Sequence, residues 1–335
     1  MIRRGLSIPI WSFAWLIAMG CAVWAFGALH YDFPAGKSVA AWTFAAAVVA
    51  VMIFLRGARK KLGAVFAIFA LVLACWLTLQ PSNDRVWQPD VAQTAWAEIN
   101  GDEVTLHNVR NCDYRTETDY TPRWETRTVR LSQLIGIDLA INYWGSPWMA
   151  HPIFSFQFAD SPPVCFSIET RKEVGESYSA IGGLYRQFEL IYIVADERDV
   201  LRVRTNYRHG EDVYLYRTTL APAAARERFL NYLKPINAMR SRPRWYNALT
   251  TNCTTAIRTQ NSPSERMPWD WRILVNGKAD EMMYERGLIA TGSLHFTELK
   301  HHSRINDRAR AAGPATSFST HIREGLPDRF VQQSN

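Results

Sequence analysis

Three long stretches without a charged side chain, all near the start of the chain, most constrain what this protein folds into. They cover residues 8–29, 39–55 and 62–79 of the 335-residue sequence. A helix needs about 17–25 apolar residues to cross a bilayer, and each stretch approaches or exceeds that length. A signal peptide is the alternative for the first stretch, but its apolar run is long for that role and two more follow directly. The pattern predicts a three-helix transmembrane anchor over residues 1–80.

Basic residues between these stretches predict the orientation in the membrane. Arg3 and Arg4 precede the first stretch, Lys37 is the only Lys or Arg between the first and second, and four basic residues crowd positions 56–61. Positively charged loops stay in the cytoplasm. We therefore expect a multi-pass protein of the bacterial inner membrane, with everything after residue 79 in the periplasm.

The net charge of the chain does not indicate a nucleic-acid partner. The formal net charge is +7, but the first 61 residues hold seven Lys or Arg and one Asp, which accounts for six of those charges. The exported part is therefore almost neutral and has no basic excess that would attract nucleic acid.

The exported part divides into a linker, one domain and a tail. Residues 81–89 are polar, contain two prolines and show no periodicity, which is typical of a linker. Residues 90–305 mix strand-like alternating runs with a few helical stretches, the clearest at 222–239, and this predicts an α+β domain. Residues 306–335 form a polar C-terminal tail without periodicity, and we expect residues 311–335 to be loosely ordered.

Two alternating runs predict a β-hairpin. In residues 151–158, His151 lies on the face opposite the phenylalanines at 154, 156 and 158. In residues 164–171, Glu169 and Arg171 lie opposite the apolar side chains at 164, 166 and 168. Pairing the apolar faces of the two strands places His151 on the same face as Glu169 and Arg171.

Cys253 lies in the stretch WYNALTTNCTTAIR at residues 245–258. Asn252 is a favoured N-cap residue, so Cys253 is expected in the first turn of a helix. There, free backbone N–H groups and the helix dipole favour the thiolate and can hold an oxyanion. This predicts a catalytic nucleophile, with Asn252 and Thr254 beside the oxyanion. The alternative is a small buried cysteine at the start of a helix.

A cysteine nucleophile needs a base, and the base needs an orienting group. His151 has the best context, because it opens a strand whose other face is core, and Glu169 is the natural group to orient its ring. The alternatives are a surface histidine and a strand carboxylate paired with Arg171. The adjacent His301 and His302 do not converge on one ion without other ligands, so we expect no metal and no cofactor.

The exported part contains three cysteines, Cys112, Cys165 and Cys253. An oxidising compartment permits a disulfide between Cys112 and Cys165 and leaves Cys253 as the free thiol. We therefore predict that bridge. Spacing alone does not prove the pairing.

Several ordered motifs resemble the Lnb-type periplasmic domain family. They are NVRNCDY at 108–114, DLAINYW at 138–144, HPIFSFQF at 151–158, the long run at 167–204 and WYNALTTNCTT at 245–255. The resemblance covers residues 90–305, while the three apolar stretches lie outside it. His151 precedes Cys253, the order found in circularly permuted papain-like enzymes, which are similar to NlpC-like and lecithin:retinol-acyltransferase-like proteins. Cys112 stands where the family motif would have an aromatic or apolar residue.

The resemblance implies a function in the cell envelope. Lnb proteins are associated with N-acylation of bacterial lipoproteins through a papain-like thiol site that takes an acyl chain from phospholipid. By that resemblance His151 is the base and Cys253 the nucleophile of a membrane-anchored acyltransferase whose partners are membrane lipid and a lipoprotein acceptor. Trp245, Tyr246 and Arg171 are candidate substrate contacts. The alternatives are a cysteine peptidase or amidase acting on the cell envelope, and a non-catalytic scaffold. The sequence makes no prediction of oligomeric state.

Overall fold

The computed structural model describes the chain except for residues 1–6, 34–36, 251–269, 274–275, 313–316 and 330–335. The chain forms two compact units. The first contains residues 1–82 together with 176–189 and 244–249, and the second contains the remaining residues.

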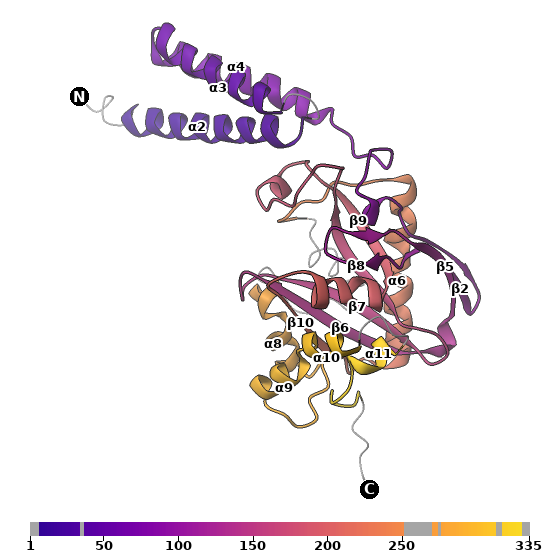
Figure 1. Cartoon of the computed structure of the whole chain (residues 1–335). Coiled ribbons are helices and arrows are strands. Elements are labelled where there is room, and N and C mark those ends of the chain that lie inside the picture. The colour runs from indigo at the N-terminus through magenta and orange to yellow at the C-terminus, as the bar shows by residue number, and fades with distance from the viewer. Residues whose placement is uncertain (1–6, 34–36, 251–269, 274–275, 313–316, 330–335) are drawn as a thin grey trace. The chain divides into compact units, whose positions relative to one another are not determined.

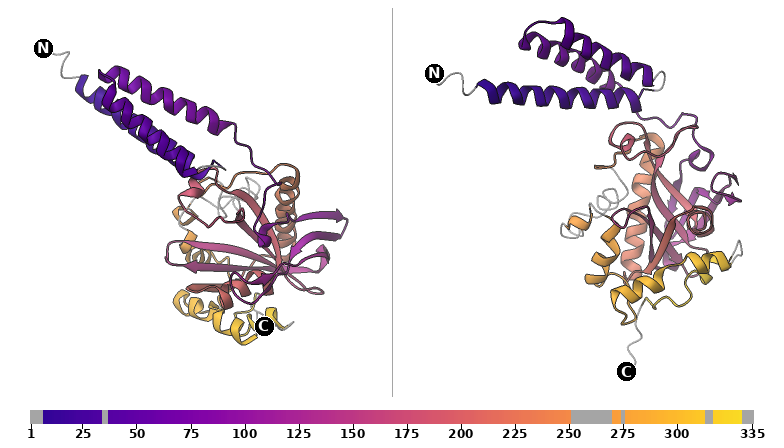
Figure 2. Two further views of the ribbon diagram at one scale, coloured as in Figure 1. Left: turned by 45° about the horizontal axis from the view of Figure 1, so that its top comes forward. Right: turned by 60° about the vertical axis from the view of Figure 1, so that its left-hand side comes forward.

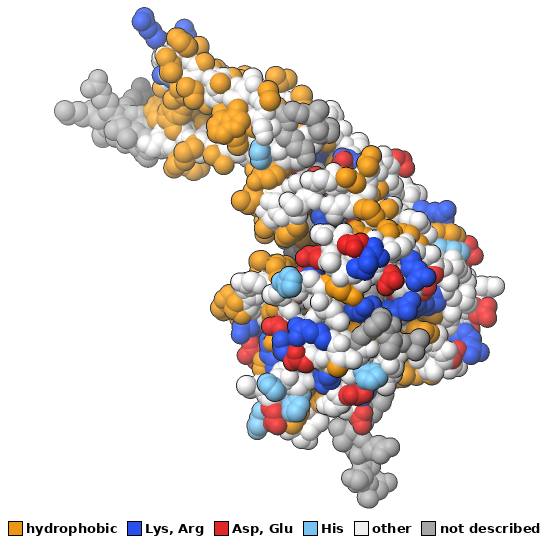
Figure 3. Space-filling view, in the orientation of Figure 1, with side chains coloured by type: hydrophobic (Ala, Val, Ile, Leu, Met, Phe, Trp, Pro, Cys, Tyr) orange, Lys and Arg blue, Asp and Glu red, His pale blue; other side chains and the backbone are white. Residues whose placement is uncertain are grey.

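The helical unit is built on three apolar helices, α2 (Ser7–Tyr31), α3 (Lys37–Phe54) and α4 (Ala58–Leu77), as the sequence predicts. Within the described residues, α2 from Trp11 and α4 are long and apolar enough to cross a membrane, whereas α3 is shorter. In the most apolar 18-residue stretch of each helix, only 22% of the residues of α2 and 17% of those of α4 are buried. The apolar side chains of these helices therefore face outward, as Figure 3 shows, which distinguishes them from core helices of a soluble domain.

The second unit is an α+β domain around one mixed sheet (Figure 1). The sheet has the strand order β1-β2-β9-β8-β7-β6-β10, with β5 paired to β2. Its strands are β1 (Trp96–Asn100), β2 (Glu103–Arg110), β5 (Trp124–Arg130), β6 (Leu134–Trp144), β7 (Ala150–Phe158), β8 (Val164–Arg171), β9 (Glu189–Asp196) and β10 (Glu211–Arg217). A separate short hairpin joins β3 (Asp113–Tyr114) and β4 (Tyr120–Thr121).

The predicted hairpin is confirmed as β7 and β8. The strands pair antiparallel, with Phe154 opposite Phe166 and Phe156 opposite Val164. These rings pack against Phe229 and Tyr232 of α6 (Pro222–Ser241), the long orange helix in Figure 2. Period-two alternation thus places one face of the hairpin against α6.

The other face of the sheet is also covered, which the sequence did not predict. Ile153 and Cys165 on this face pack in a buried cluster with Ile305, Phe318 and Ile322. The covering helices are α5 (Glu197–Val200), α10 (Asn306–Ala312) and α11 (Phe318–His321), the last two yellow in Figure 2. Helices α8 (Ala279–Glu285) and α9 (Phe296–Ser303) also belong to the domain.

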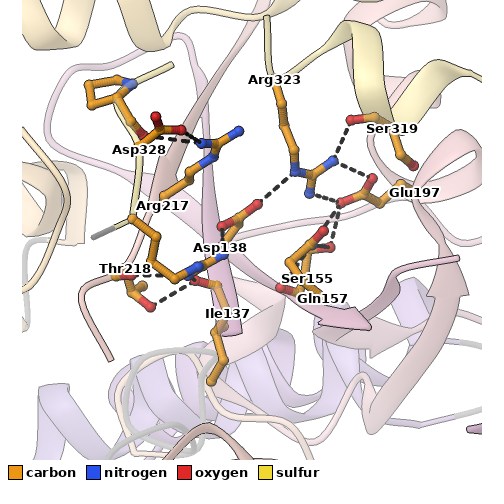
Figure 4. A network of polar contacts seen from close by, with 12 residues as sticks. Ile137, Asp138, Ser155, Gln157, Glu197, Arg217, Thr218, Ser319, Arg323 and Asp328 are labelled. Atoms are coloured by element: carbon orange, nitrogen blue, oxygen red, sulfur yellow. Dashed lines mark hydrogen bonds and ion pairs between the residues drawn. The ribbon is translucent and has the colours of Figure 1, made fainter. Parts of the chain in front are cut away.

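The prediction of loose order over residues 311–335 is therefore wrong for the described part of that segment. Arg323 lies between two fully buried carboxylates and donates to Asp138 Oδ2 at 2.8 Å and to Glu197 Oε2 at 2.8 Å (Figure 4). Arg329 reaches the other oxygen of Asp138 at 2.5 Å. Buried charges are stable only when they are paired. The segment is polar because its arginines, Arg323 and Arg329, have acidic partners inside the domain, and the polar composition therefore does not indicate disorder.

Most of the predicted linker, residues 83–89, also packs against the domain. The indole of Trp87 is buried, and the Asn83 amide donates to the Met239 carbonyl at 3.0 Å. The guanidinium of Arg171 lies over the Trp87 ring at 4.3 Å from its centroid. Residues 83–89 are thus fixed to the domain by side-chain contacts.

Candidate functional site

His151 and Glu169 come together as the hairpin predicts, but a third side chain lies between them. His151 Nε2 is 2.7 Å from the Ser167 hydroxyl oxygen and 3.7 Å from Glu169 Oε1. The Ser167 hydroxyl donates to Glu169 Oε1 at 2.6 Å. All three lie on the same face of β7 and β8, because Ser167 and Glu169 are two residues apart in one strand. Glu169 therefore acts on His151 mainly through Ser167.

The direction of these hydrogen bonds fixes the histidine tautomer. The pKa of Glu169 is well below its ordinary value: burial raises it, but the surrounding charges and hydrogen bonds, led by Arg204, together lower it by more. An ionised carboxylate only accepts, so the single hydroxyl proton of Ser167 goes to Glu169. Ser167 must then accept from His151, whose Nε2 carries the proton. This assignment leaves Nδ1 as the ring atom with a free lone pair.

Burial keeps His151 uncharged. Removal from water lowers the pKa of its imidazole to about 4; Arg204 lowers it as well, and Glu169 raises it. Arg204 donates to Glu169 Oε1 at 2.9 Å, so its charge balances the carboxylate and limits the stabilisation that Glu169 offers an imidazolium. At neutral pH the ring is thus a neutral group that can accept a proton.

Two further groups at this site were not singled out from the sequence. Arg204 lies in a π-helical turn, Val203–Tyr207, an irregular element that often occurs at functional sites. Asn142 of β6 is the cross-strand partner of His151, and its buried Oδ1 atom has no hydrogen-bond partner in the described part of the chain. Strand alternation could not reveal Arg204, since its contact with Glu169 joins elements 35 residues apart.

Arg171 has a structural role in place of the predicted substrate contact. Its side chain is buried, and it donates to the carbonyls of Val91 at 2.9 Å and Ala92 at 2.7 Å and to Asn83 Oδ1 at 2.8 Å. Glu169 forms its ion pair with Arg204, and not with Arg171 as the alternative prediction had it.

The residues around the predicted nucleophile are only partly described. Cys253, Asn252 and Thr254 lie outside the described residues. Trp245 forms a β-bridge with Glu189, and the buried Tyr246 donates its backbone N–H to Phe188 at 2.9 Å. Both residues belong to the helical unit, in a segment that ends four residues before Cys253.

The structure contains Cys112 and Cys165 as free thiols and not as the predicted disulfide. They lie in different hydrophobic clusters: Cys112 packs with Tyr114 and Val203, whereas Cys165 packs in the cluster that includes Ile153. Burial, followed by the nearby Asp199, raises the pKa of the Cys112 thiol to about 12. Both burial and Glu197 raise the pKa of Cys165. Neither thiol is therefore a reactive one.

A polar cavity of about 200 Å³ lies beside Cys112. Its lining residues are Asn111, Cys112, Asp113, Arg123, Arg198 and Arg202. Arg198 Nε donates to the side-chain amide oxygen Oδ1 of Asn111 at 2.9 Å. Among the described residues, no group of three or more His, Cys, Asp or Glu side chains could hold a metal ion.

The apolar helices beside an α+β domain are typical of a membrane-associated protein. Residues 120–277 match the family model described as the Lnb N-terminal periplasmic domain, which supports the predicted resemblance and a periplasmic location of this domain. The match includes strands β6 to β10 and therefore His151, Ser167, Glu169 and Arg204. No curated protein and no solved structure matches the chain.

Proposed function

We propose that this protein is a membrane-anchored cysteine acyltransferase of the cell envelope, which moves an acyl chain from phospholipid to an amine such as a lipoprotein N-terminus. The observation that carries the proposal is the chain of contacts from His151 through Ser167 to Glu169. It supplies a buried, neutral histidine with one ring nitrogen held and the other free, as a general base requires.

Cys253 is the proposed nucleophile of this site. The buried Cys112 and Cys165 have raised pKa values, and Cys21 and Cys75 belong to α2 and α4. Cys253 remains as the exported thiol for which the sequence predicts a helix N-terminus, where the thiolate is favoured. The order His151 before Cys253 supports a permuted papain-like arrangement.

The proposed reaction has two steps. His151 Nδ1 takes the proton of the Cys253 thiol, and the thiolate attacks the ester carbonyl of the phospholipid. The glycerol oxygen leaves with a proton from His151, and the acyl chain remains on Cys253 as a thioester. The amine then attacks the thioester and forms an amide, and the thiolate is released and takes back a proton. Backbone N–H groups near Asn252 and Thr254 are the proposed donors to the oxyanion.

The proposed topology is multi-pass, with the N-terminus and residues 56–61 in the cytoplasm of the inner membrane and the domain in the periplasm. The charge distribution between α2, α3 and α4 supports it. Both substrates of the proposed reaction reside in the membrane, so an anchored enzyme has them at high local concentration.

The test is direct observation of the thioester. Purified protein in detergent or nanodiscs is incubated with acyl-labelled phospholipid, without an amine acceptor. We expect a hydroxylamine-sensitive label on the wild type and on Cys75→Ser, an exposed cysteine of α4 that serves as the control. Cys253→Ser should carry no label. A diacylated lipopeptide with a free N-terminus should then remove the label and become an amide.

Other outcomes assign other functions. Release of free fatty acid with no transfer to the lipopeptide would indicate a lipid hydrolase. Cleavage of cell-wall peptide, with no label from phospholipid, would support a cysteine peptidase or amidase. Identical behaviour of the wild type and Cys253→Ser in all three assays would leave the scaffold as the function.

A further inference from the structure

The segment that connects β8 to β9 belongs to the helical unit. Residues 176–189 cluster with α2, α3 and α4. The Tyr185 ring lies against α2 at Gly27, where a Cβ atom would come within 2.0 Å of the Tyr185 hydroxyl. Tyr31 stacks on the same ring at 5.5 Å between centroids, and Trp24 lies at 6.2 Å. A glycine at position 27 thus makes room for a tyrosine from the exported part of the chain.

Arg186, the next residue, ties the segment to the ends of two helices. Its backbone N–H donates to Asp32 Oδ1 at 2.9 Å, just beyond the end of α2. Its guanidinium donates to the carbonyls of Trp76 at 2.8 Å and Leu79 at 3.1 Å, at the end of α4. The same guanidinium lies 3.6 Å from the centroid of the Trp76 ring. These contacts fix the segment at the helix ends that the charge pattern places on the periplasmic side.

The segment also exposes apolar side chains on its surface. Residues 177–185, SYSAIGGLY, contain no charge. Three of its side chains are exposed, Tyr178 by 48%, Ile181 by 58% and Leu184 by 43%. Leu249, exposed by 69%, adjoins them, because Ala248 donates to the Gly183 carbonyl at 2.7 Å. Tyr178, Ile181, Leu184 and Leu249 thus form an apolar patch.

We propose that this patch is inserted in the periplasmic leaflet of the bilayer that α2 and α4 cross. Tyr185 and Arg186 hold the segment at the helix ends, and lipid is the apolar phase available there. Aromatic residues near the interface (Trp24, Tyr31, Trp76 and Tyr185) and a cationic residue at the same level match the composition of membrane–water boundaries. The inference rests on the membrane topology of the proposed function, and not on its chemistry.

The test measures contact with lipid and is independent of catalysis. Full-length protein with Cys21, Cys75 and Cys253 replaced by Ser, and with the buried Cys112 and Cys165 kept, receives one added cysteine at position 181, 184 or 249. This cysteine is labelled with a polarity-sensitive fluorophore in nanodiscs. Two exposed apolar positions serve as matched controls, Val23 on α2 and Ile99 on β1. Nitroxide-labelled phospholipid should quench the labels at 181, 184 and 249 several-fold, as we also expect for Val23→Cys, and should leave Ile99→Cys unchanged.

Labels at 181, 184 and 249 that behave like Ile99→Cys, while Val23→Cys is quenched, would overturn the inference and leave the membrane anchor intact. An unquenched Val23→Cys would instead overturn the membrane topology, and with it both proposals. The three separate labelling positions guard against a single variant that fails to fold.

Discussion

The Nε2 atom of His151 lies 2.7 Å from the hydroxyl of Ser167, which donates in turn to Glu169. This relationship gives Ser167 a positioning role: it holds the imidazole in one tautomer and one orientation. The carboxylate beyond it is already shared with Arg204, so the ring is oriented without being charged.

Ser167→Ala should lower kcat and leave KM nearly unchanged, because the ring loses its orientation while the binding surface stays. We expect a loss of about tenfold to a hundredfold, a part of the 10²–10⁴-fold that a positioned acid or base contributes. His151→Ala should lose essentially all acyl loading. Ser167→Thr keeps the hydroxyl and should restore most of the rate; equal losses for Thr and Ala would assign Ser167 to packing alone.

Arg204→Gln should raise the pKa of His151. The Arg204 charge opposes protonation of the ring and also neutralises Glu169, so its removal acts in the same direction twice. In the wild type the imidazole has a pKa of about 4, which places the acid limb of activity near that pH. The limb should move upward in Arg204→Gln, and NMR titration of the His151 ring should show the same shift. An unchanged titration would contradict the role of Arg204.

Arg323→Met should strongly destabilise the domain, since it leaves Asp138 and Glu197 buried without their shared partner. Breaking a buried pair costs about 3–5 kcal/mol in the free energy of unfolding. Arg310→Met is the control, because Arg310 forms an exposed pair with Asp307 and such pairs contribute about 0–1 kcal/mol. Denaturant unfolding of the solubilised protein measures both, and similar losses would refute a special role for Arg323.

The same network predicts a loss of stability in acid. Burial raises the pKa of Glu197, but Arg323 and the hydrogen bonds around it bring the pKa below its ordinary value. A carboxyl whose pKa is lower in the folded state stabilises the fold above its unfolded pKa of about 4.3, and this contribution disappears as pH falls through the folded pKa. The difference in stability between wild type and Glu197→Gln should therefore shrink below about pH 4.

Gly27→Ala should destabilise the helical unit, because the added methyl group meets the Tyr185 ring. Overpacking of this kind costs about 1–3 kcal/mol. Gly20→Ala in the same helix has open space around its Cβ and should be neutral. Combining Gly27→Ala with Tyr185→Ala should cost less than the two changes added together. Thermal unfolding in nanodiscs measures the four variants; strict additivity would mean that the two residues do not contact one another.

The hairpin and the helix at 222–241 could be predicted because their signal is local. Alternation with a period of two places Phe154 and Phe156 on one face and His151 on the other, and the structure confirms this. The meeting of His151 with Glu169 follows from the same register, and no contact from elsewhere in the chain is needed to find it.

The remainder of the site depends on contacts between residues far apart in sequence. Arg323 is 185 residues from Asp138 and 126 from Glu197, so its polar surroundings in the sequence predicted disorder. Arg204 reaches Glu169 from a π-helical turn that no periodicity predicts. Cys112 and Cys165 lie in the same domain but pack in separate clusters. The number of cysteines in the sequence does not predict which of them lie close enough to form a disulfide.

The docking of residues 318–329 on the sheet also bears on biogenesis. In a chain that is made and exported from its N-terminus, every strand of the sheet reaches the periplasm before Arg323 does. Until then Asp138 and Glu197 lack the cation that makes their burial tolerable. The sheet therefore cannot bury both carboxylates with their shared cation until the chain has been made as far as Arg323.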